Sequence, residues 1–440
     1  MDPLSYLQAL PRFADQGADA YQPGLERIRV LLEAMGQPHQ AYPSVHIAGT
    51  NGKGSTASFL AAIARSAGYR VGLHTSPHLW QVTERMRVDG QPAPITWLKA
   101  AVVRYRDLFE QVRPSFFEAT VALSFLYFAE QQVALAVVEV GLGGRLDATN
   151  VLLPRLAIIT SIGLDHTDLL GDTVVAIARE KAGIIKPGIP VLTSALQPEV
   201  QAVVREVAAA HGAPYHLLWD EVRYELVSEA PPLTHLNVHT PLRHYEGLQI
   251  GLPGRHQVAN ALLALRAAEL VLPEVAHHPT AVTEGLRDVC RLSGLRGRFD
   301  VLRTCPLVVA DVAHNPDGLA SVLATLAQYP IAGQRYALWG ALRDKDAATM
   351  AHQLVAAGFA VYVVALESHR AWPANALVDL VHQAGGHVLG AGTVLEGWAL
   401  LQQHLQPTDA VLITGSHQVV AGLPASLWES KAAALSLVPR

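Results

Sequence analysis

The chain has 440 residues, of which 50% are hydrophobic and 16% are charged, and its formal net charge at pH 7 is −5. This composition excludes a disordered chain and is typical of a globular protein large enough for two hydrophobic cores. Because the charges form no long block of either sign, the sequence also excludes a basic surface for nucleic acid and a polybasic membrane anchor. We expect a monomer that acts on small molecules.

The stretch MDPLSYLQAL at the start of the chain lacks the basic segment and long apolar run of a targeting sequence, so we expect a cytoplasmic protein. No uninterrupted apolar stretch reaches the roughly 18 residues that a membrane span needs. The two cysteines, Cys290 and Cys305, have no metal-type spacing, and we interpret both as small apolar residues.

The first motif along the chain is HIAGTNGKGST. It begins in a short apolar strand over 43–47 and runs into apolar residues at helical spacing over 55–67, while Gly49 and Gly52 permit the positive φ values of a tight turn. Free N–H groups at the start of the helix, the helix dipole and the charge of Lys53 would together bind an anion. The motif therefore predicts a phosphate-binding loop.

The spacing of this loop departs from the usual G-x-x-x-x-G-K-[ST] pattern, because its first two glycines are closer together and a third follows Lys53. An ordinary glycine turn with a solvated lysine is therefore the alternative interpretation. If the loop does bind a nucleotide, the hydroxyl of Ser55 or Thr56 can reach the Mg²⁺ that the nucleotide carries.

Strand-like runs then alternate with helical stretches, namely SVHIAG, YRVGLHT, ALAVVEVG, LAIITSIG and IPVLTS with amphipathic stretches such as 118–131 and 173–185. This alternation predicts parallel strands joined by crossover helices. Residues 214–252 carry prolines, histidines and short polar–apolar alternations, which predict an antiparallel appendage at the edge of the sheet. A helix over 257–271 is expected to close this domain.

A second series of strands and helices starts with FDVLRTCPLVVADVA and continues with RYALWGAL, AVYVVAL, HVLGAG and AVLITG. It predicts a smaller, Rossmann-like α/β domain. The short basic stretch between the two series places a hinge around 292–297. We therefore predict an α/β fold with a P-loop ATPase-like, mostly parallel domain over 1–295 and a second α/β domain over 296–440.

Candidate catalytic residues follow the strands of the first domain. Glu139 ends the run ALAVVEVG, at the strand end where open α/β sheets place their ligands. A cation would compensate this carboxylate, and Mg²⁺ suits an oxygen ligand near phosphate, although an ion pair with Arg145 is an alternative. Ser76 and His166 follow neighbouring strands, so that with Glu139 they would form a two-metal site; otherwise His166 is one of many surface or core histidines.

The segment GLGGRLDATN after Glu139 also invites a dinucleotide-binding interpretation. Leucine stands where G-x-G-x-x-G needs its third glycine, and no acidic residue closes a later strand in the expected frame, so we reject that interpretation. Asp147, Thr149 and Asn150 instead offer polar groups in a loop that faces the same crevice.

Further charged residues lie on later segments. The helix TVVAIAREKAGIIK carries Lys181 and Lys186, and nothing in the pattern separates them from each other or from ordinary solvated lysines. In the second domain, Asp311 and His314 follow a strand and Arg298 lies just past the hinge. They could close over a nucleotide, or Asp311 could simply cap the helix that starts at the next proline.

The motifs GTNGKGST, TSPHL, FFEAT, EVGLGGRLDATN, SIGLDHTDLLGDT, EKAGIIKPG, LPGRHQVANA and DVAHNPDG occur in this order within residues 24–416. In type and order they resemble those of the folylpolyglutamate synthase and dihydrofolate synthase family. This family lies within the ATP-dependent amide ligases that include the bacterial cell-wall Mur ligases. Two stretches depart from the family pattern, ERM at 84–86 and the residues after TGS.

The resemblance implies a site for ATP and magnesium. ATP contacts are implied for Thr50, Asn51, Gly52, Lys53, Gly54, Ser55, Thr56, Asn260, Arg298 and Asp311, with His314 beside them. Metal contacts are implied for Ser55, Ser76, Glu139 and His166. Lys181 is implied as a carbamylated lysine near the second magnesium, which makes Lys53, Glu139, His166 and Lys181 the candidate catalytic residues. Contacts to the pterin substrate are implied near Leu25, Glu26, Arg27, Phe117, Glu118 and Ala119, with Asp147 facing them.

The implied reaction joins L-glutamate to a folate or pteroate carboxylate, which ATP first converts into an acyl phosphate. We expect the chain to act both on dihydropteroate and on reduced folates. A cell-wall amino-acid ligase, a P-loop kinase or GTPase, and a nucleotide-gated binding module are the alternatives. A kinase or GTPase would leave the second domain unexplained, and a binding module would bind nucleotide without releasing phosphate when acid and amine are both supplied.

Overall fold

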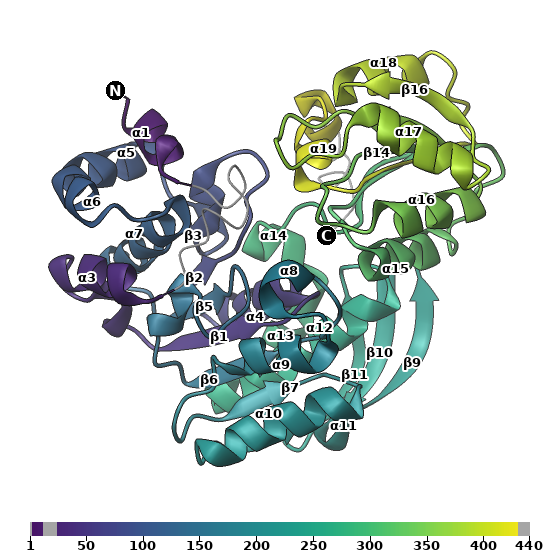
Figure 1. Ribbon diagram of the computed structural model, residues 1–440. Coiled ribbons are helices and arrows are strands. Elements are labelled where there is room, and N and C mark those ends of the chain that lie inside the picture. Colours follow the sequence, from purple (N-terminus) through teal and green to yellow (C-terminus); the bar gives the residue numbers. More distant parts are fainter. Residues whose placement is uncertain (1, 12–23, 430–440) are drawn as a thin grey trace. The chain divides into compact units, whose positions relative to one another are not determined.

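The computed structural model describes residues 2–11 and 24–429 (Figure 1). The chain divides into two compact units, Met1–Leu295 and Arg296–Arg440. Each unit is built on its own sheet with helices packed on its faces, so the predicted α/β fold class is confirmed.

The main sheet of unit 1 has eight strands in the order β4-β3-β2-β5-β1-β6-β7-β8. Strands β3 and β4 run antiparallel at one edge and the other six are parallel to one another, as the alternating pattern predicts. The strands are β1 (Ser44–Ala48), β2 (Val71–His74), β3 (Met86–Val88), β4 (Gln91–Pro92), β5 (Leu135–Glu139), β6 (Leu156–Ile159), β7 (Val191–Thr193) and β8 (Tyr215–Leu217).

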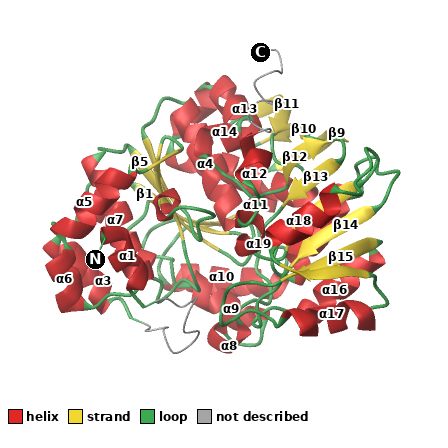
Figure 2. Ribbon diagram, turned by 90° about the horizontal axis from the view of Figure 1, so that it is seen from above, coloured by secondary structure: helices red, strands yellow, loops and turns green. Residues whose placement is uncertain are grey.

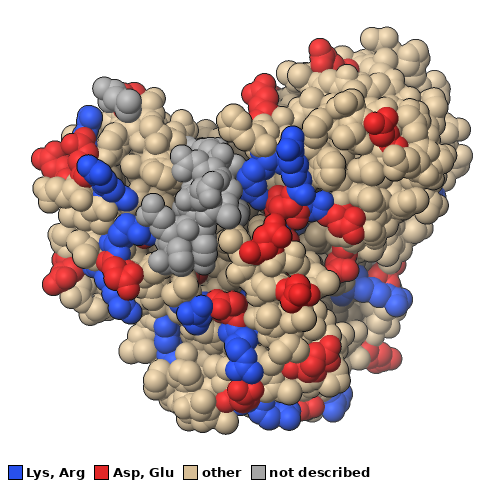
Figure 3. All heavy atoms as spheres, viewed as in Figure 1, with Lys and Arg blue, Asp and Glu red and all other residues tan. Residues whose placement is uncertain are grey.

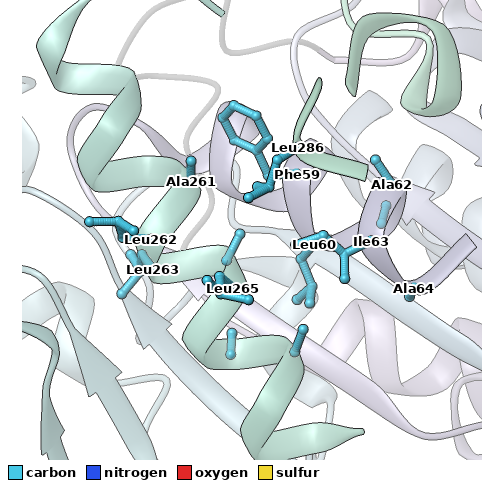
Figure 4. Close-up of a cluster of buried hydrophobic side chains, with 14 of the residues drawn as sticks. Phe59, Leu60, Ala62, Ile63, Ala64, Ala261, Leu262, Leu263, Leu265 and Leu286 are labelled. Carbon is cyan, nitrogen blue, oxygen red and sulfur yellow. The ribbon is translucent and has the colours of Figure 1, made fainter. Parts of the chain in front are cut away.

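Both faces of this sheet are buried, because alternate residues of each strand enter different cores. On one face Val45, Ile47 and Val137 pack with the helices α4 (Lys53–Ser66), α12 (Arg255–Val271) and α13 (Pro279–Arg287). Figure 4 shows Phe59 and Leu60 of α4 on the side of α12 that carries Ala261 and Leu265.

On the other face Ala136 and Val138 pack with α7 (Phe116–Glu130), while α9 (Val174–Ala182) and α10 (Pro198–Ala210) cover Ala157 and Ile159. The amphipathic pattern expected over 118–131 is wrong. Helix α7 is buried on nearly every side, because it lies between the sheet and the helices α1 (Pro3–Ala9) and α3 (Glu26–Ala34).

The antiparallel appendage is confirmed as a separate three-stranded sheet, β11-β10-β9, but it starts later than expected. Its strands are β9 (Arg223–Ala230), β10 (Leu233–His239) and β11 (His244–Ile250), and its inner residues join the core around α12. Residues 215–217 instead form β8 of the main sheet. Helix α12 does not close the unit, since α13 and α14 (Val289–Ser293) follow it.

The sheet of unit 2 has six strands in the order β12-β13-β17-β14-β15-β16, and only β12 pairs antiparallel. Its strands are β12 (Asp300–Thr304), β13 (Leu307–Ala310), β14 (Arg335–Trp339), β15 (Phe359–Val364), β16 (Val388–Gly392) and β17 (Ala410–Thr414). Val361 and Val363 face α15 (Pro316–Leu326), α16 (Ala347–Ala356) and α17 (Ala374–Gln383). Tyr362, between them, faces α18 (Val394–Gln402) on the opposite side (Figure 2).

The remaining α-helices are short: α5 (Ile95–Arg104), α6 (Arg106–Val112), α8 (Thr167–Leu170), α11 (Leu218–Glu221) and α19 (His417–Ala421). Within residues 2–11 and 24–429, no helix combines the length and apolar character that crossing a bilayer requires. On the face drawn in Figure 3, basic and acidic side chains are interspersed over unit 1, and much of the surface of unit 2 carries neither.

Candidate active site

The predicted glycine turn joins β1 to α4. Gly49 has φ 153° and Gly52 has φ 87°, as expected, and α4 begins at Lys53, so the turn delivers the helix N-terminus at the carboxyl edge of the sheet. A Cβ atom on Gly49 would lie 1.8 Å from the hydroxyl oxygen of Thr160. The turn therefore requires glycine at this position both for its conformation and for space.

Hydroxyl groups after β6 hold this turn in place. The hydroxyls of Thr160 and Ser161 both donate to the carbonyl oxygen of Asn51, at 2.7 and 3.1 Å. The hydroxyl of Thr50 donates to the carbonyl of Gly163 and accepts from its N–H. These bonds tie the turn to the segment that follows β6. Sequence reasoning missed Thr160, although a hydroxyl residue directly after a strand was the available signal.

Two lysines meet at this turn. The ammonium of Lys53 donates to the carbonyl oxygens of Gly49 and Thr50 at 3.0 and 3.1 Å, and the ammonium of Lys181 donates to Gly49 at 2.7 Å. Burial and then the nearby charge of Lys53 lower the pKa of Lys181 to about 7, although Asp165 and Asp147 oppose the shift. Lys186 lies elsewhere and donates to the carbonyl of Asn150. The structure thus separates two lysines that the helical pattern left equivalent.

Asn260 of α12, one of the predicted ATP contacts, lies against the glycine turn between β1 and α4, hereafter called the phosphate turn. A Cβ on Gly52 would lie 2.3 Å from its side-chain oxygen, and the hydroxyl of Thr56 lies 3.5 Å from the same oxygen. Thr56 is therefore directed toward α12. Ser55, on the same first turn of α4, is left as the better of the two candidates for a metal ligand.

Glu139 and Ser76 also lie together, since the backbone N–H of Ser76 donates to Oε2 of Glu139 at 3.0 Å. Arg145 pairs with Glu180 at 2.9 Å, which rules out the alternative ion pair with Glu139. His166 has φ 50° and directly precedes α8, and its Nε2 lies 4.0 Å from a carboxylate oxygen of Asp165.

These side chains fit a magnesium ion that arrives with phosphate. In the part of the chain that the structure describes, no three His, Cys, Asp or Glu side chains form a group that could hold a metal by themselves. Mg²⁺ commonly takes one or two carboxylates and completes its shell with phosphate oxygens and water. The carboxylate of Glu139 and the hydroxyls of Ser55 and Ser76 match that donor set.

The residues expected near the pterin lie where α3 meets α7. Glu118 accepts from the guanidinium of Arg27 at 3.1 Å and forms the capping box of α7 with Ser115. Phe117 is partly exposed and packs over Gly141, directly after the strand of Glu139. Leu25 packs at the margin of the core, Glu26 is exposed, and Ala119 is fully buried.

Asp147 begins the short η4 turn (Ala148–Val151) and is almost completely buried. Its carboxylate accepts from the N–H groups of Leu142 and Thr149, at 2.9 and 3.0 Å. Burial raises its pKa, and the hydrogen bonds from Thr149 and Leu142 oppose that shift.

In unit 2, the carboxylate of Asp311 accepts from the backbone N–H groups of Phe299 and Ala313, at 2.7 and 2.8 Å. Asn315 caps α15, so the alternative in which Asp311 caps this helix is wrong. Burial raises the pKa of Asp311 to about 6, against the opposing charge of Arg298. His314 lies nearby, and its Nδ1 donates to the carbonyl of Val312.

Comparison with known proteins agrees with this arrangement. Residues 47–268 match the Mur ligase middle domain, and residues 297–417 match the Mur ligase glutamate ligase domain. The chain is 37% identical over 365 residues to a dihydrofolate synthase/folylpolyglutamate synthase of Bacillus subtilis, covering 81% of this chain and 84% of that protein. It belongs to the folylpolyglutamate synthase and dihydrofolate synthase family.

Solved structures of this family share the fold. Escherichia coli FolC in complex with DHPP and ADP matches with TM-score 0.85 and 30% identity, over 99% of both chains. A bifunctional folylpolyglutamate synthase/dihydrofolate synthase with Mn, AMPPNP and L-glutamate bound matches with TM-score 0.81 and 30% identity, over 97% of both chains. The chain is thus an ATP-dependent ligase of the Mur type, and the kinase, GTPase and binding-module alternatives are wrong.

Proposed function

We propose that this ligase adds L-glutamate to a folate carboxylate with ATP, acting on both dihydropteroate and reduced folates, in the cytoplasm and as a monomer. The observation that carries the proposal is the pairing of the phosphate turn with a buried lysine, in which Lys53 and Lys181 converge on Gly49 beside Glu139. The relatives with folate-ligase names and the related structures with ADP, AMPPNP and DHPP support it.

A carboxylate is a poor electrophile, so amide formation requires its activation first. In the proposed reaction an oxygen of the acceptor carboxylate attacks the γ-phosphorus of ATP, the bond to the bridging oxygen breaks, and ADP leaves. The amine of L-glutamate then attacks the acyl phosphate, and inorganic phosphate and a proton are released. Lys53 and the N–H groups of the turn stabilise the charge on the transferring phosphoryl group.

The contacts to ATP follow from this scheme. In unit 1 they are assigned to Thr50, Asn51, Gly52, Lys53, Gly54, Ser55, Thr56 and Asn260. The contacts predicted for Arg298, Asp311 and His314 concern unit 2 and stay predictions. Ser55, Ser76, Glu139 and His166 are assigned as ligands of Mg²⁺, which when bound neutralises phosphate charge. Unit 2 is proposed to serve the glutamate half of the reaction.

Lys181 is proposed to react with CO₂, because an amine with a pKa of about 7 is partly unprotonated at neutral pH. Its nitrogen attacks carbon dioxide, a proton leaves, and the product is a carbamate anion. This change converts two neighbouring cations into a pair of opposite charge, which relieves the repulsion from Lys53. The anion would then lie beside the phosphate turn, where it could supply an oxygen ligand to a second magnesium ion.

The acceptor is proposed to lie near the junction of α3 and α7. Leu25, Glu26, Arg27 and Phe117 are the contacts that remain accessible, at least in part, to a substrate. Glu118 orients the guanidinium of Arg27, and Ala119 supports the helix from inside the core. Asp147 faces this region from the loop after Glu139.

One assay tests the proposal. ADP release is measured with ATP, Mg²⁺ and L-glutamate, and the acceptor is varied among dihydropteroate, tetrahydrofolate and a cell-wall peptide precursor. Stimulation by both pteridine acceptors is expected. Stimulation by dihydropteroate alone would limit the activity to addition of the first glutamate, and stimulation by tetrahydrofolate alone would limit it to addition of later glutamates. Stimulation by the cell-wall precursor alone would make the substrate assignment wrong.

A further inference from the structure

Two buried histidines flank Val138 on one face of the main sheet, His46 of β1 and His74 of β2. His74 contacts the hydroxyl of Ser124 in α7, whereas His46 contacts the loop after Glu139. His46 of β1 pairs in register with Val138 of β5, so both side chains point toward the core around α7. The imidazole of His46 is completely buried, and burying such a group is costly unless it forms a hydrogen bond. Its Nε2 lies 2.8 Å from the hydroxyl oxygen of Thr149.

The direction of each hydrogen bond in this group can be assigned. The hydroxyl of Thr149 contacts Oδ1 of Asp147, which already accepts the backbone N–H of Thr149. In this contact the Thr149 hydroxyl donates a hydrogen bond and the carboxylate of Asp147 accepts it. The hydroxyl oxygen of Thr149 then accepts a hydrogen bond from His46, whose Nε2 carries the proton. Burial holds the pKa of His46 at about 3, so the ring is neutral, and Nδ1 has no hydrogen-bond partner among the described residues.

Asp147 in turn closes the 142–150 loop, which lies between the strand of Glu139 and the helix of Lys181. Its other oxygen accepts from the N–H of Leu142, just after the strand of Glu139. The same loop docks on the end of α9, where the N–H of Arg145 donates to Glu180 and the amide of Asn150 donates to Gly183. A Cβ on Gly144 would lie 3.0 Å from Cα of Lys181, so the loop backbone rests directly on this lysine.

We propose that His46 and Thr149 are positioning residues, which act through Asp147 to hold the 142–150 loop so that Glu139 and Lys181 keep their places beside the phosphate turn. The proposal rests on the proposed function only in that it takes these two side chains to act in the reaction. In the hydrogen-bonded series His46–Thr149–Asp147, the ring N–H of His46 and the hydroxyl of Thr149 are both used as donors. A substitution that removes either donor therefore breaks the series.

The kinetic test compares near-isosteric variants. Thr149→Val removes the hydroxyl and Thr149→Ser keeps it, while His46→Leu removes the donor and His46→Gln keeps one. We expect Thr149→Val and His46→Leu to lower kcat about tenfold or more, as loss of one buried hydrogen bond permits, with the KM for ATP changed less than about twofold. Thr149→Ser and His46→Gln should recover most of kcat. Equal losses in Thr149→Ser and Thr149→Val, or no loss in either, would overturn the proposal.

Amide hydrogen exchange tests the same network without any reaction. The N–H of Leu142 should exchange at least about tenfold faster in Thr149→Val than in wild type, while amides of β1 and β5 keep their protection. Unchanged exchange at Leu142 sinks the proposal even if activity falls. If wild type shows no folate-dependent turnover but the exchange result holds, the proposed function fails and the loop assignment stands. Should Thr149→Val fail to fold, His46→Gln and His46→Leu provide the same comparison.

Discussion

Lys53 and Lys181 donate hydrogen bonds to the same atom, the carbonyl oxygen of Gly49, at 3.0 and 2.7 Å. Two ammonium groups at one oxygen repel each other, and burial removes the water that would otherwise screen them. The unprotonated form of Lys181 is therefore favoured. A buried, partly unprotonated amine can react as a nucleophile, and in this site the amine beside the phosphate turn is that of Lys181.

Replacing Lys181 tests the carbamate. Lys181→Ala removes the proposed anion and should lower kcat by about a hundredfold or more, since the loss concerns a charged group in a buried site. Short carboxylic acids such as acetate or propionate should restore part of the activity by occupying the vacated space. Lys186→Ala is the matched control, because this lysine is also partly buried but donates to Asn150 of the 142–150 loop, so that any loss of activity in this variant should not be restored by the acids. Rescue of both variants, or of neither, would contradict the role assigned to Lys181.

The pH dependence of stability gives an independent measure of the same amine. The folded-state pKa of Lys181 is about 7 and the unfolded value is 10.5, so the unfolded state binds more protons between these two values. Stability should therefore rise with pH across this window and lose that slope below about pH 7. In CO₂-free buffer, Lys181→Met should lessen the slope of the unfolding free energy by up to about 1.4 kcal/mol per pH unit. Urea unfolding at a series of pH values checks this, and parallel curves for the two proteins would refute it.

The phosphate turn should not tolerate a side chain at Gly49. In Gly49→Ala the new Cβ would meet Thr160 at 1.8 Å, and nucleotide binding should weaken by about tenfold or more because the turn must shift. Gly68→Ala is the control, since Gly68 also has positive φ, 91°, but its Cβ would meet nothing within 4 Å. That control should cost about 1 kcal/mol of stability and leave affinity unchanged. Titration calorimetry with ADP decides, and equal affinities for the two variants would contradict this account of the turn.

A buried ionic network should stabilise the join between α12 and the three-stranded sheet. Glu269 is inaccessible to solvent and accepts from Thr240, Tyr245 and Arg266 at 2.7, 3.1 and 3.1 Å. Glu269→Ala removes the acceptor of the Tyr245 hydroxyl and leaves the buried Arg266 paired with Glu221 alone, so unit 1 should lose about 1–3 kcal/mol of stability. Glu225→Ala, on the exposed part of β9, should change stability by less than about 0.5 kcal/mol. Urea unfolding of both variants checks the difference, and a loss below 1 kcal/mol in Glu269→Ala would be inconsistent with the network as described.

The sequence by itself determined the alternation of strands and helices, the antiparallel appendage and the glycine turn before α4. These features depend on local periodicity and on the conformational freedom of glycine, which neighbouring residues largely specify. Pattern reasoning failed for α7, because a helix enclosed by a sheet and by other helices needs no polar face. It also extended the appendage into 215–217, since a three-residue edge strand carries little pattern.

Only the tertiary structure decided which of several equivalent side chains belong together. Lys181 and Lys186 lie on one sequence segment with no local difference, yet one reaches Gly49 across the sheet edge and the other reaches Asn150. Arg145 likewise pairs with Glu180 and not with Glu139, and His46 contacts Thr149 of a loop that is distant in the sequence. Hydrogen bonds and charge interactions act over a few ångströms in space, and residues far apart in the chain come that close only when the sheet has formed.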